Sequence, residues 1–269
     1  IDTPRQIAES DSGNIFVGSR NAGTISVINS NKEIRVIAQG LSNSTGVTYH
    51  NGDLYFSEVS SIWKIPNIDE ALSSSEKMPE KVLVTNNLPS DTWHGWKWID
   101  FGPDNKLYVP VGAPCNICNP SLEEKYNFDK RYASIMRLNE GEWEYVARGV
   151  RNTVGFDWHP ETQNLYFGDN GRDWMGDDMP SCELNVVSND DAFYGYPYKH
   201  SMDVFDPDYS KKIPDNAEEF IDPILELGAH VAPTGLSFYD GDHFPEKYKN
   251  TLFMTLHGSW NRSRKVGYK

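Results

Sequence analysis

The sequence predicts an all-β fold of the propeller class, and three observations lead to this prediction. A unit recurs in which a strand-like segment, a Gly/Asn/Asp turn, an aromatic and β-branched strand and a further strand follow one another. The second strands of the first four units, near Phe16, Tyr55, Tyr108 and Tyr166, are about 40–60 residues apart, as in four-stranded antiparallel propeller blades. Helix is scarce, with a helical pattern only at 68–72. A β-sandwich also alternates strands and turns, but the repeated turn followed by Leu or Ile and two aromatic or β-branched residues favours the propeller.

The strands of five blades can be placed in order along the chain. The expected strands are 5–9, 14–19, 24–28 and 33–38; then 46–49, 53–58, 61–65 and 81–85; then 98–101, 106–111, 133–138 and 143–147; then 155–158, 164–168 and 183–187; and finally 235–239 and 251–255, with 265–268 as a candidate third strand. Because a propeller closes by pairing its first and last blades, an open stack leaves one face unpaired. We therefore expect a single propeller domain over 1–269 that is incomplete at its C-terminus, with a first strand missing before Ile1.

The segment 188–224 is too long for a hairpin loop and is predicted to be an insertion in the fourth blade. Long loops in compact domains are usually functional. This one carries Tyr194, Tyr196, Tyr198 and His200, so it gathers aromatic and titratable side chains.

Composition narrows the class of partner. The formal net charge of −14 argues against nucleic acid and anionic membranes, since both require a basic face. An acidic surface also fits a protein that holds a divalent cation. No apolar run reaches the roughly 18–20 residues that span a bilayer, so no membrane span is expected. Polar residues follow Ile1 at once, so any signal peptide was removed or was never present.

The three cysteines are Cys115, Cys118 and Cys182. The Cys-x-x-Cys pair is compatible with a local disulfide, which is favoured, and also with free thiols, a half metal site or a redox pair. A zinc site needs a second ligand pair, which the sequence lacks, and Asn119 stands where haem attachment requires histidine. A disulfide implies a periplasmic or secreted protein. Cys182 is then an odd thiol, or pairs with a group outside this chain.

Seven histidines are the best candidates for a general base near neutral pH. His94 lies between Trp93 and Trp96, just before the inner strand of the third blade, where propeller sites face the central channel. His230 and His257 hold equivalent places in the fifth blade. A histidine between tryptophans is also compatible with a purely structural role. The remaining histidines are interpreted as turn or surface residues: His50, His159, His200 and His243.

A polar constellation follows the third blade. Arg151 and Asn152 together offer a planar bidentate donor and an amide to carboxylates or carbonyls, although Arg151 is equally compatible with a surface charge. The loop 169–178 combines four aspartates with two glycines, which suits Ca²⁺. It is not an EF-hand, because the aspartate spacing differs and no helices flank it. An acidic solvated loop is the alternative interpretation.

Six motifs in order, over nearly the whole chain, resemble the glucose/sorbosone dehydrogenase family of soluble quinoproteins, especially its L-sorbosone dehydrogenase-like branch. These motifs are His94-Gly-Trp-Lys-Trp-Ile99, 102–118, Arg148-Gly-Val-Arg-Asn152 continuing to 160, 169–178, His230-Val-Ala-Pro-Thr-Gly235 and His257-Gly-Ser-Trp-Asn-Arg262. The resemblance implies a six-bladed β-propeller. It also implies pyrroloquinoline quinone (PQQ) with Ca²⁺ as cofactors and an aldose or sugar aldehyde such as sorbosone as substrate.

The resemblance also implies roles for individual residues. His94 aligns with the general base of hydride transfer to PQQ, and Arg151 with Asn152 aligns with the pair that contacts the quinone oxygens. Arg151 would also stabilise the oxyanion that develops there. Gly171 and Arg172 align with two residues whose backbone carbonyls ligate the PQQ-bound Ca²⁺.

Further residues of the same region are predicted to complete the site. His230, His257 and Arg262 are expected to bind the cofactor; His257 replaces a lysine that glucose dehydrogenases use for a PQQ carboxylate, and Arg262 is a candidate to compensate. Four aromatic residues are expected to form the entrance of the site and to stack on the sugar ring: Trp93, Trp96, Trp174 and Tyr194.

The remaining partner is an electron acceptor. Since the chain has no haem site, electrons are expected to leave to a separate protein or molecule such as a cytochrome or a quinone. Two other classes are built on similar propellers: a Ca²⁺-dependent hydrolase of the lactonase type, which needs converging carboxylates, and a non-catalytic ligand- or protein-binding propeller.

Overall fold

The computed structural model describes residues 1–74 and 78–268, and strands are the main secondary structure in them. The chain divides into two compact units, Ile1–Val109 and Pro110–Lys269, which we call unit 1 and unit 2. None of the helices in the described part of the chain is long and apolar enough to cross a membrane.

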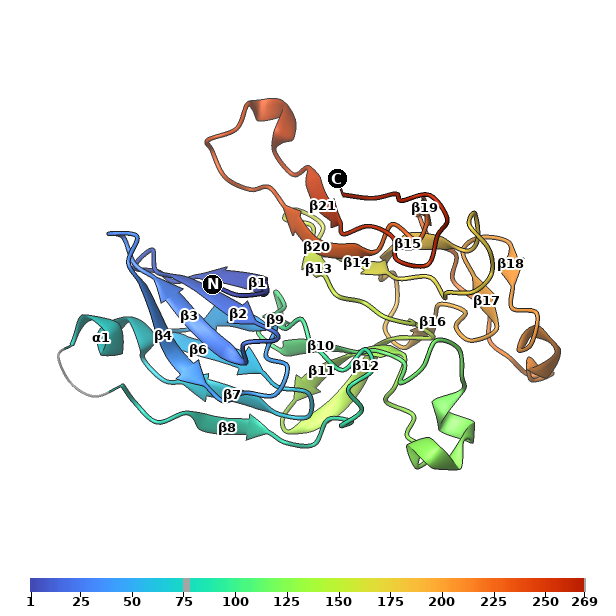
Figure 1. Ribbon diagram of the computed structural model, residues 1–269, viewed down its shortest axis with the longest axis horizontal. Helices are drawn as coiled ribbons and strands as arrows, with labels where there is room; N and C mark the ends of the chain where they lie inside the picture. The colour runs from blue at the N-terminus through green and yellow to red at the C-terminus, as the bar shows by residue number, and fades with distance from the viewer. Residues whose placement is uncertain (75–77, 269) are drawn as a thin grey trace. The chain divides into compact units, whose positions relative to one another are not determined.

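Unit 1 contains two four-stranded sheets in which consecutive strands pair antiparallel, and Figure 1 shows the strands of each sheet side by side. The first sheet is β1 (Pro4–Glu9), β2 (Ile15–Ser19), β3 (Thr24–Ile28) and β4 (Ile34–Gln39). The second is β5 (Val47–His50), β6 (Asp53–Ser57), β7 (Ile62–Ile65) and β8 (Val82–Thr85). The helix α1 (Ile68–Ser73) follows β7, as its sequence pattern predicts.

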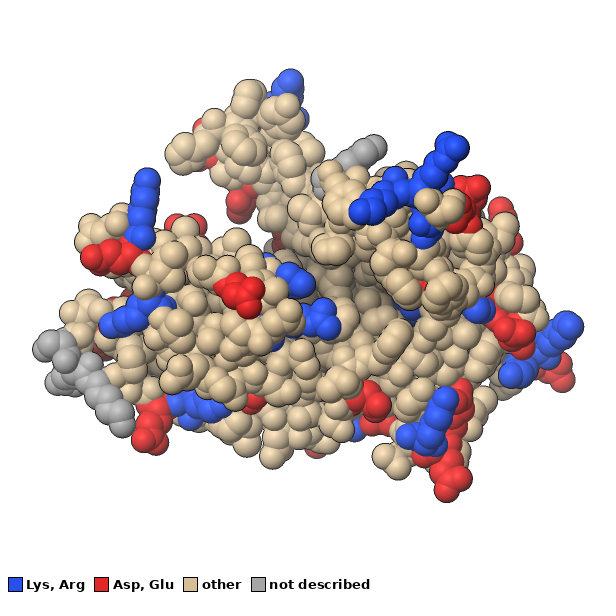
Figure 2. Space-filling model, in the orientation of Figure 1, with Lys and Arg blue, Asp and Glu red and all other residues tan. Residues whose placement is uncertain are grey.

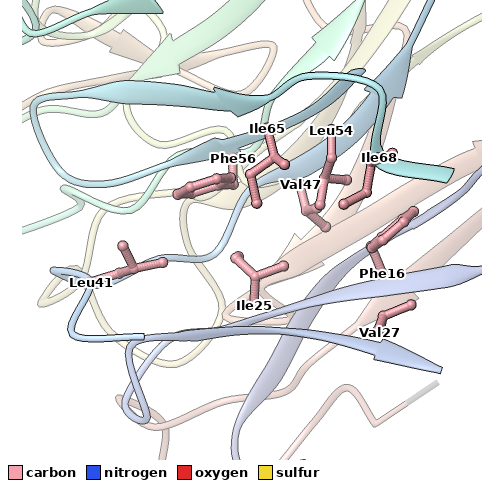
Figure 3. Packing of buried hydrophobic residues seen from close by; sticks show 9 residues of the cluster. All are labelled: Phe16, Ile25, Val27, Leu41, Val47, Leu54, Phe56, Ile65 and Ile68. Atoms are coloured by element: carbon pink, nitrogen blue, oxygen red, sulfur yellow. The ribbon is translucent and has the colours of Figure 1, made fainter. Parts of the chain in front are cut away.

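The core of unit 1 lies between these two sheets and is aliphatic and aromatic (Figure 3). Phe16 of β2 and Ile25 of β3 pack with Leu54 and Phe56 of β6, and all four are fully buried. Alternate residues of a strand point to the same face, so the inward set is buried while Tyr55 between them is only half-buried. Burial of each such side chain stabilises the fold by about 1.5–3 kcal/mol.

The third sheet has the strand order β16-β12-β11-β10-β9, and the boundary between the units falls within β10. Its strands are β9 (Asp100–Phe101), β10 (Leu107–Val111), β11 (Ser134–Asn139), β12 (Glu142–Arg148) and β16 (Ala192–Phe193). The last of these pairs parallel to β12. Two 3-10 turns, η1 (Pro120–Leu122) and η2 (Glu124–Tyr126), lie between β10 and β11.

The fourth sheet is antiparallel in the order β13-β14-β15-β19, and its outer strand comes late in the sequence. Its strands are β13 (Phe156–Trp158), β14 (Leu165–Asp169), β15 (Ser181–Val186) and β19 (Leu225–Ala229). Between β15 and β19 the chain forms β16, the hairpin β17 (Lys199–His200) and β18 (Val204–Phe205), and the turn η3 (Ser210–Lys212). The predicted insertion thus separates the third strand of this sheet from the fourth.

The last sheet has two strands, β20 (Pro233–Phe238) and β21 (Leu252–Leu256), with the turn η4 (Glu246–Tyr248) between them. The candidate strand at 265–268 was wrong. Gly267 and Tyr268 have φ values of 90° and 60°, outside the extended region. Val266 also folds back, since its carbonyl accepts a hydrogen bond from the Ser259 amide at 2.9 Å.

The prediction of an all-β fold is confirmed. Three of the sheets are four-stranded and antiparallel as expected, whereas the third carries β16 as an added parallel strand and the last has two strands. The six-blade count stays a prediction. Acidic and basic side chains are interspersed rather than gathered by sign on the face shown in Figure 2. The net charge of −14 therefore does not form one wide acidic patch on that face.

Candidate functional site

The candidate site in unit 2 begins at a four-residue disulfide loop. Cys115 and Cys118 form the disulfide favoured from the sequence, and Cys182 is a buried free thiol. The hydroxyl of Tyr196 accepts a hydrogen bond from the Cys118 amide at 3.1 Å and lies 3.4 Å from the Cys115 sulfur. Tyr196 is itself buried, so the loop is fixed from both ends.

Asn116, inside the disulfide loop, holds the side chain of Arg151. Its carbonyl accepts from Arg151 Nε at 2.8 Å, and its Oδ1 accepts from Arg151 Nη2 at 2.9 Å. The same Oδ1 accepts from the Asp173 amide at 2.8 Å, and Nδ2 donates to the Asp173 carbonyl at 3.0 Å. A third bond runs from Arg151 Nη1 to the Asn170 carbonyl at 3.0 Å. Arg151 is 3% exposed, so it is not the surface charge that its spacing alone allowed.

The backbone at Arg151 and Asn152 is anchored by the carboxylate of Asp169 at the end of β14. Asp169 accepts from the Arg151 amide at 2.8 Å and from the Asn152 amide at 2.6 Å. Burial nevertheless raises the pKa of Asp169 to about 6. The side-chain oxygen of Asn152 is buried and has no hydrogen-bond partner among the described residues. A buried polar atom without a partner is costly, so this oxygen keeps the capacity to accept one hydrogen bond.

The loop after β14 carries the two predicted metal ligands. Arg172 is buried, its guanidinium paired with Asp206, and Gly171 is half-buried. Within the described part of the chain no donor reaches the carbonyl oxygen of either residue. Two such carbonyls beside an oxygen-rich loop have the chemistry that Ca²⁺ selects.

The carboxylates of the same loop do not converge on one point. Asp169 binds the backbone at Arg151 and Asn152, whereas Asp177 accepts from the Ser263 amide at 3.0 Å. The described residues contain no group of three or more His, Cys, Asp or Glu side chains placed to hold a metal.

Two of the predicted cofactor-binding residues contact this loop. His230 is buried, and its Nε2 donates to the Gly176 carbonyl at 2.8 Å while Nδ1 lies 3.8 Å from Asp173 Oδ1. Arg262 donates through Nη2 to Asp178 at 2.9 Å and through Nη1 to the Asp177 carbonyl. Its Nε is buried without a partner among the described residues.

The other predicted residues of unit 2 differ in exposure. Trp174 is 68% exposed, has φ of 69°, and meets Trp260 edge-on with ring centroids 5.6 Å apart. His257 is exposed, so the loop places it in reach of solvent rather than in the buried network. The positive φ of Trp174 is unusual for a bulky residue and marks a strained turn.

Two interpretations in the insertion need correction. Tyr194 is 6% exposed, its hydroxyl donates to the Val186 carbonyl at 2.8 Å, and its ring packs on Phe167. It is a core residue, and we do not include it in a sugar-binding mouth. His200 is not a turn or surface residue: it is buried and lies 3.0 Å from Asp206 through Nε2. Burial lowers the pKa of His200.

Unit 1 carries the predicted general base. His94 is 9% exposed, has φ of 51°, and lies between Trp93 and Trp96 with centroid distances of 5.7 and 6.2 Å. Trp93 is 52% exposed, while the half-buried Trp96 is covered by the Arg20 guanidinium, 3.7 Å from the ring centroid. Trp93 is thus the more available stacking face of the two.

Sequence reasoning missed the role of three side chains that shape these regions, of which Glu183 and Lys97 are buried and Asn116 is half-buried. Asn116 was seen only as part of the cysteine motif, yet it makes four of the bonds that fix the site. Glu183 on β15 is opposite Asp169 in the sheet register, and burial raises its pKa to about 8. Lys97 is almost fully buried three residues after His94, and burial lowers its pKa to about 7. Asn116 and Lys97 lie within two of the six motifs, which was the only signal that pointed to them, and Glu183 lies outside the motifs.

The family of the chain follows from comparison with known sequences. The model of the family described as TrAA12-like matches residues 1–269. The chain belongs to the TrAA12-like family. An uncharacterized protein of Borreliella burgdorferi is 38% identical over 278 residues, which covers all of this chain and 71% of that protein.

Solved structures similar to this TrAA12-like chain support the same fold. The PQQ domain of pyranose dehydrogenase from Coprinopsis cinerea, in its holo form, has a TM-score of 0.77 and 19% identity, covering 100% of this chain and 74% of its own. A calcium structure of a Trichoderma reesei AA12 enzyme has a TM-score of 0.74 and 20% identity, covering 99% and 76%. The PQQ-bound aldose sugar dehydrogenase of Streptomyces coelicolor has a TM-score of 0.65 and 18% identity, covering 100% and 81%. Together with the TrAA12-like family match, this shared fold confirms the predicted family resemblance.

Proposed function

We propose that this chain is a quinoprotein oxidoreductase that oxidises a sugar, with PQQ and Ca²⁺ as its cofactors. Three kinds of observation support the proposal: membership of the TrAA12-like family, a fold shared with solved PQQ-containing sugar dehydrogenases, and a buried polar site that fits the cofactors. The single observation that carries it is the turn at Arg151 and Asn152. There a fixed guanidinium and a buried amide oxygen without a partner lie in one network with the Gly171 and Arg172 loop.

The guanidinium of Arg151 is oriented by the protein before any ligand binds. Its five N–H groups include three that donate to Asn116 and Asn170, so two remain for another acceptor. The guanidinium also lies 3.7 Å from the Asp173 carboxylate. We propose that the two remaining N–H groups bind oxygens of an electron-poor ring, in a geometry set before the reaction. The carbonyls of Gly171 and Arg172 would hold Ca²⁺.

When bound, PQQ with Ca²⁺ supplies a two-electron acceptor that no side chain can provide. We assign His94 the role of the general base that accepts the proton of the reacting sugar hydroxyl, as a neutral imidazole can do near pH 7. Trp93 and Trp174 offer exposed ring faces for the sugar. The two electrons then pass to a separate acceptor such as a cytochrome or a quinone.

The finer substrate class we propose is an aldose or a sugar aldehyde of the sorbosone type. We also propose that the four-stranded sheets of this chain are blades of a six-bladed propeller. The Cys115–Cys118 disulfide supports a periplasmic or secreted location, because such bonds persist in oxidising compartments.

Replacing the proposed base tests this function. We expect His94→Ala to lower PQQ-dependent dye reduction with aldoses by at least about a hundredfold, the usual contribution of a general base. PQQ affinity and the melting temperature should stay near the wild-type values. His243→Ala, at an exposed position, is the matched control. Undiminished turnover in His94→Ala would remove His94 from this role.

A further inference from the structure

A cavity of about 430 Å³ lies within unit 2, and none of its lining residues is among the candidate cofactor, metal or base residues. Its walls come from three stretches of chain: the segment before β11, the end of β12, and the insertion at 191–198. Small-molecule sites typically measure about 300–1,000 Å³, so the cavity is large enough for a compact organic ligand.

The walls of the cavity are rich in aromatic rings that are held in place by their neighbours. Tyr198 accepts a hydrogen bond from Asn119 Nδ2 at 2.9 Å, and its ring stacks on Phe220 with centroids 6.1 Å apart. Tyr196 is fixed through its bond to the Cys118 amide. Tyr145 is half-buried on β12 and lines the cavity. Rings that are fixed in advance lose little entropy when they bind a ligand.

A charge pair stands beside these rings. Arg148 forms ion pairs with Asp191 and, at 2.8 Å, with Glu218, and it donates to the Asp191 carbonyl at 2.7 Å. Its guanidinium also lies 5.8 Å from the centre of the Phe193 ring. Arg148 and Asp191 therefore present hydrogen-bond donors and acceptors in fixed positions next to the Phe193 ring.

Fixed aromatic rings beside the ion pairs of Arg148 limit the class of ligand that the cavity can bind. The two carboxylates already compensate Arg148, and the other cation that lines the cavity, Lys130, is an exposed single ammonium. The cavity is therefore poorly suited to a phosphate, which binds best to several uncompensated cations that converge on it. A purely apolar ligand would strip water from the ion pair without replacing its hydrogen bonds. A pyranose ring meets both requirements, since its C–H face stacks on aromatic rings and its hydroxyls bond to guanidinium and carboxylate groups.

We propose that this cavity is a second carbohydrate-binding site, separate from the site that holds the cofactor. It binds one sugar ring between Tyr145 and Phe193, with the Arg148–Asp191 pair bonding the hydroxyls. The inference stands without the proposed oxidation, because none of the residues proposed to hold PQQ or Ca²⁺ or to act as the base lines the cavity.

Ligand-observed NMR saturation transfer and calorimetry test the site on the whole chain without PQQ or Ca²⁺. The probes are glucose and cellobiose, with inorganic phosphate as the non-sugar probe. The variants are Tyr145→Ala, Tyr145→Phe and, as the matched control, Tyr166→Ala, a half-buried tyrosine on β14 outside the cavity. Melting temperatures are measured for each, so that loss of binding is separated from loss of fold.

We expect a sugar to bind with millimolar affinity and phosphate not to bind. Tyr145→Ala should weaken the sugar roughly three- to tenfold, as expected for one aromatic contact, while Tyr145→Phe and Tyr166→Ala leave it unchanged. No sugar binding to a folded chain would overturn the proposal. So would binding that Tyr145→Ala does not alter, because the sugar would then lie elsewhere.

Discussion

Unit 1 and unit 2 both keep titratable side chains away from water, but they do so in different surroundings. In unit 1 the ammonium of Lys97 donates to the Gly95 carbonyl at 2.6 Å, and no carboxylate pairs with it in the described part of the chain. In unit 2 Arg151, Asp169 and Asn116 are linked through several hydrogen bonds. The remaining core of unit 1 is apolar and lies between two regular sheets.

The difference separates two ways of building a site. An apolar core is stabilised by burial of each side chain, so its stability is spread over many residues. A buried polar network depends on every partner being present, because an unpartnered group costs its full desolvation. We therefore expect single substitutions to alter stability in unit 1 and ligand affinity in unit 2.

The largest change in stability is expected from the core of unit 1. Leu54 is fully buried, so Leu54→Ala should lower the free energy of unfolding by about 2–5 kcal/mol through lost burial and a cavity. Chemical denaturation measures it, with Leu122→Ala at an exposed position as the control. A loss below about 1 kcal/mol would mean that the core is less tightly packed than the structure shows.

Asn116→Ala is expected to lower mainly the affinity for the cofactor. It removes the side-chain bonds to Arg151 Nη2 and to the Asp173 backbone, which should cost about 1–3 kcal/mol and loosen the guanidinium, while the bonds of Arg151 to the Asn116 and Asn170 carbonyls remain. PQQ affinity, measured by quinone absorbance, should fall about tenfold, because the guanidinium of Arg151 is less tightly oriented.

The control for Asn116→Ala is Asn139→Ala, which removes a 2.6 Å bond to Glu144 on the third sheet. Stability is expected to fall in both variants, and PQQ affinity only in Asn116→Ala. Equal PQQ affinity in the two variants would show that Asn116 supports the fold without positioning Arg151.

Glu183 gives unit 2 a dependence on pH. Its pKa of about 8 in the folded chain lies above the ordinary value of 4.5, because burial and then Asp169 disfavour the charge. The folded chain therefore holds more protons than the unfolded chain between about pH 4.5 and 8, and stability falls as pH rises, by at most about 1.4 kcal/mol per pH unit. Glu183→Gln should flatten this slope in urea denaturation, while Glu142→Gln, at an exposed position, should not. An unchanged slope would show that Glu183 is ionised at little cost.

Lys97 should give unit 1 the opposite slope in a higher range of pH. Burial lowers its pKa from 10.5 to about 7, so the unfolded chain holds more protons between about pH 7 and 10.5. Stability should rise with pH over that range, and Lys97→Met should flatten the rise. The control is Lys106→Met, because Lys106 lies directly before β10 and is only half-buried. A slope that survives Lys97→Met would assign it to another group.

Much of the fold could be predicted because local patterns specify it. Strands such as β3 and β6 alternate inward and outward residues between Gly/Asn/Asp turns, so their bounds were found within about two residues. β19 was missed because it pairs with β15 across a long insertion, and no local pattern records such a pairing.

Candidate site residues could be predicted where two polar side chains are neighbours in the sequence. Arg151 and Asn152 were found because a guanidinium and an amide stand side by side, whereas Asn116 joins them only through the disulfide loop. Tyr194 was misplaced because an aromatic residue in a long loop has the same sequence signal whether it faces solvent or core. Burial, which decides the pKa of Glu183 and Lys97, is a property of the tertiary structure.

The most direct test of the proposed function is a titration of the protein with PQQ in the presence of Ca²⁺, followed by addition of aldoses. We predict saturable binding seen in the quinone absorbance, its loss on chelation of Ca²⁺, and bleaching of the oxidised quinone when a substrate sugar is added. A folded protein that shows no saturable PQQ binding, or bound PQQ that no sugar reduces, would contradict the proposal that this chain is a quinoprotein sugar oxidoreductase.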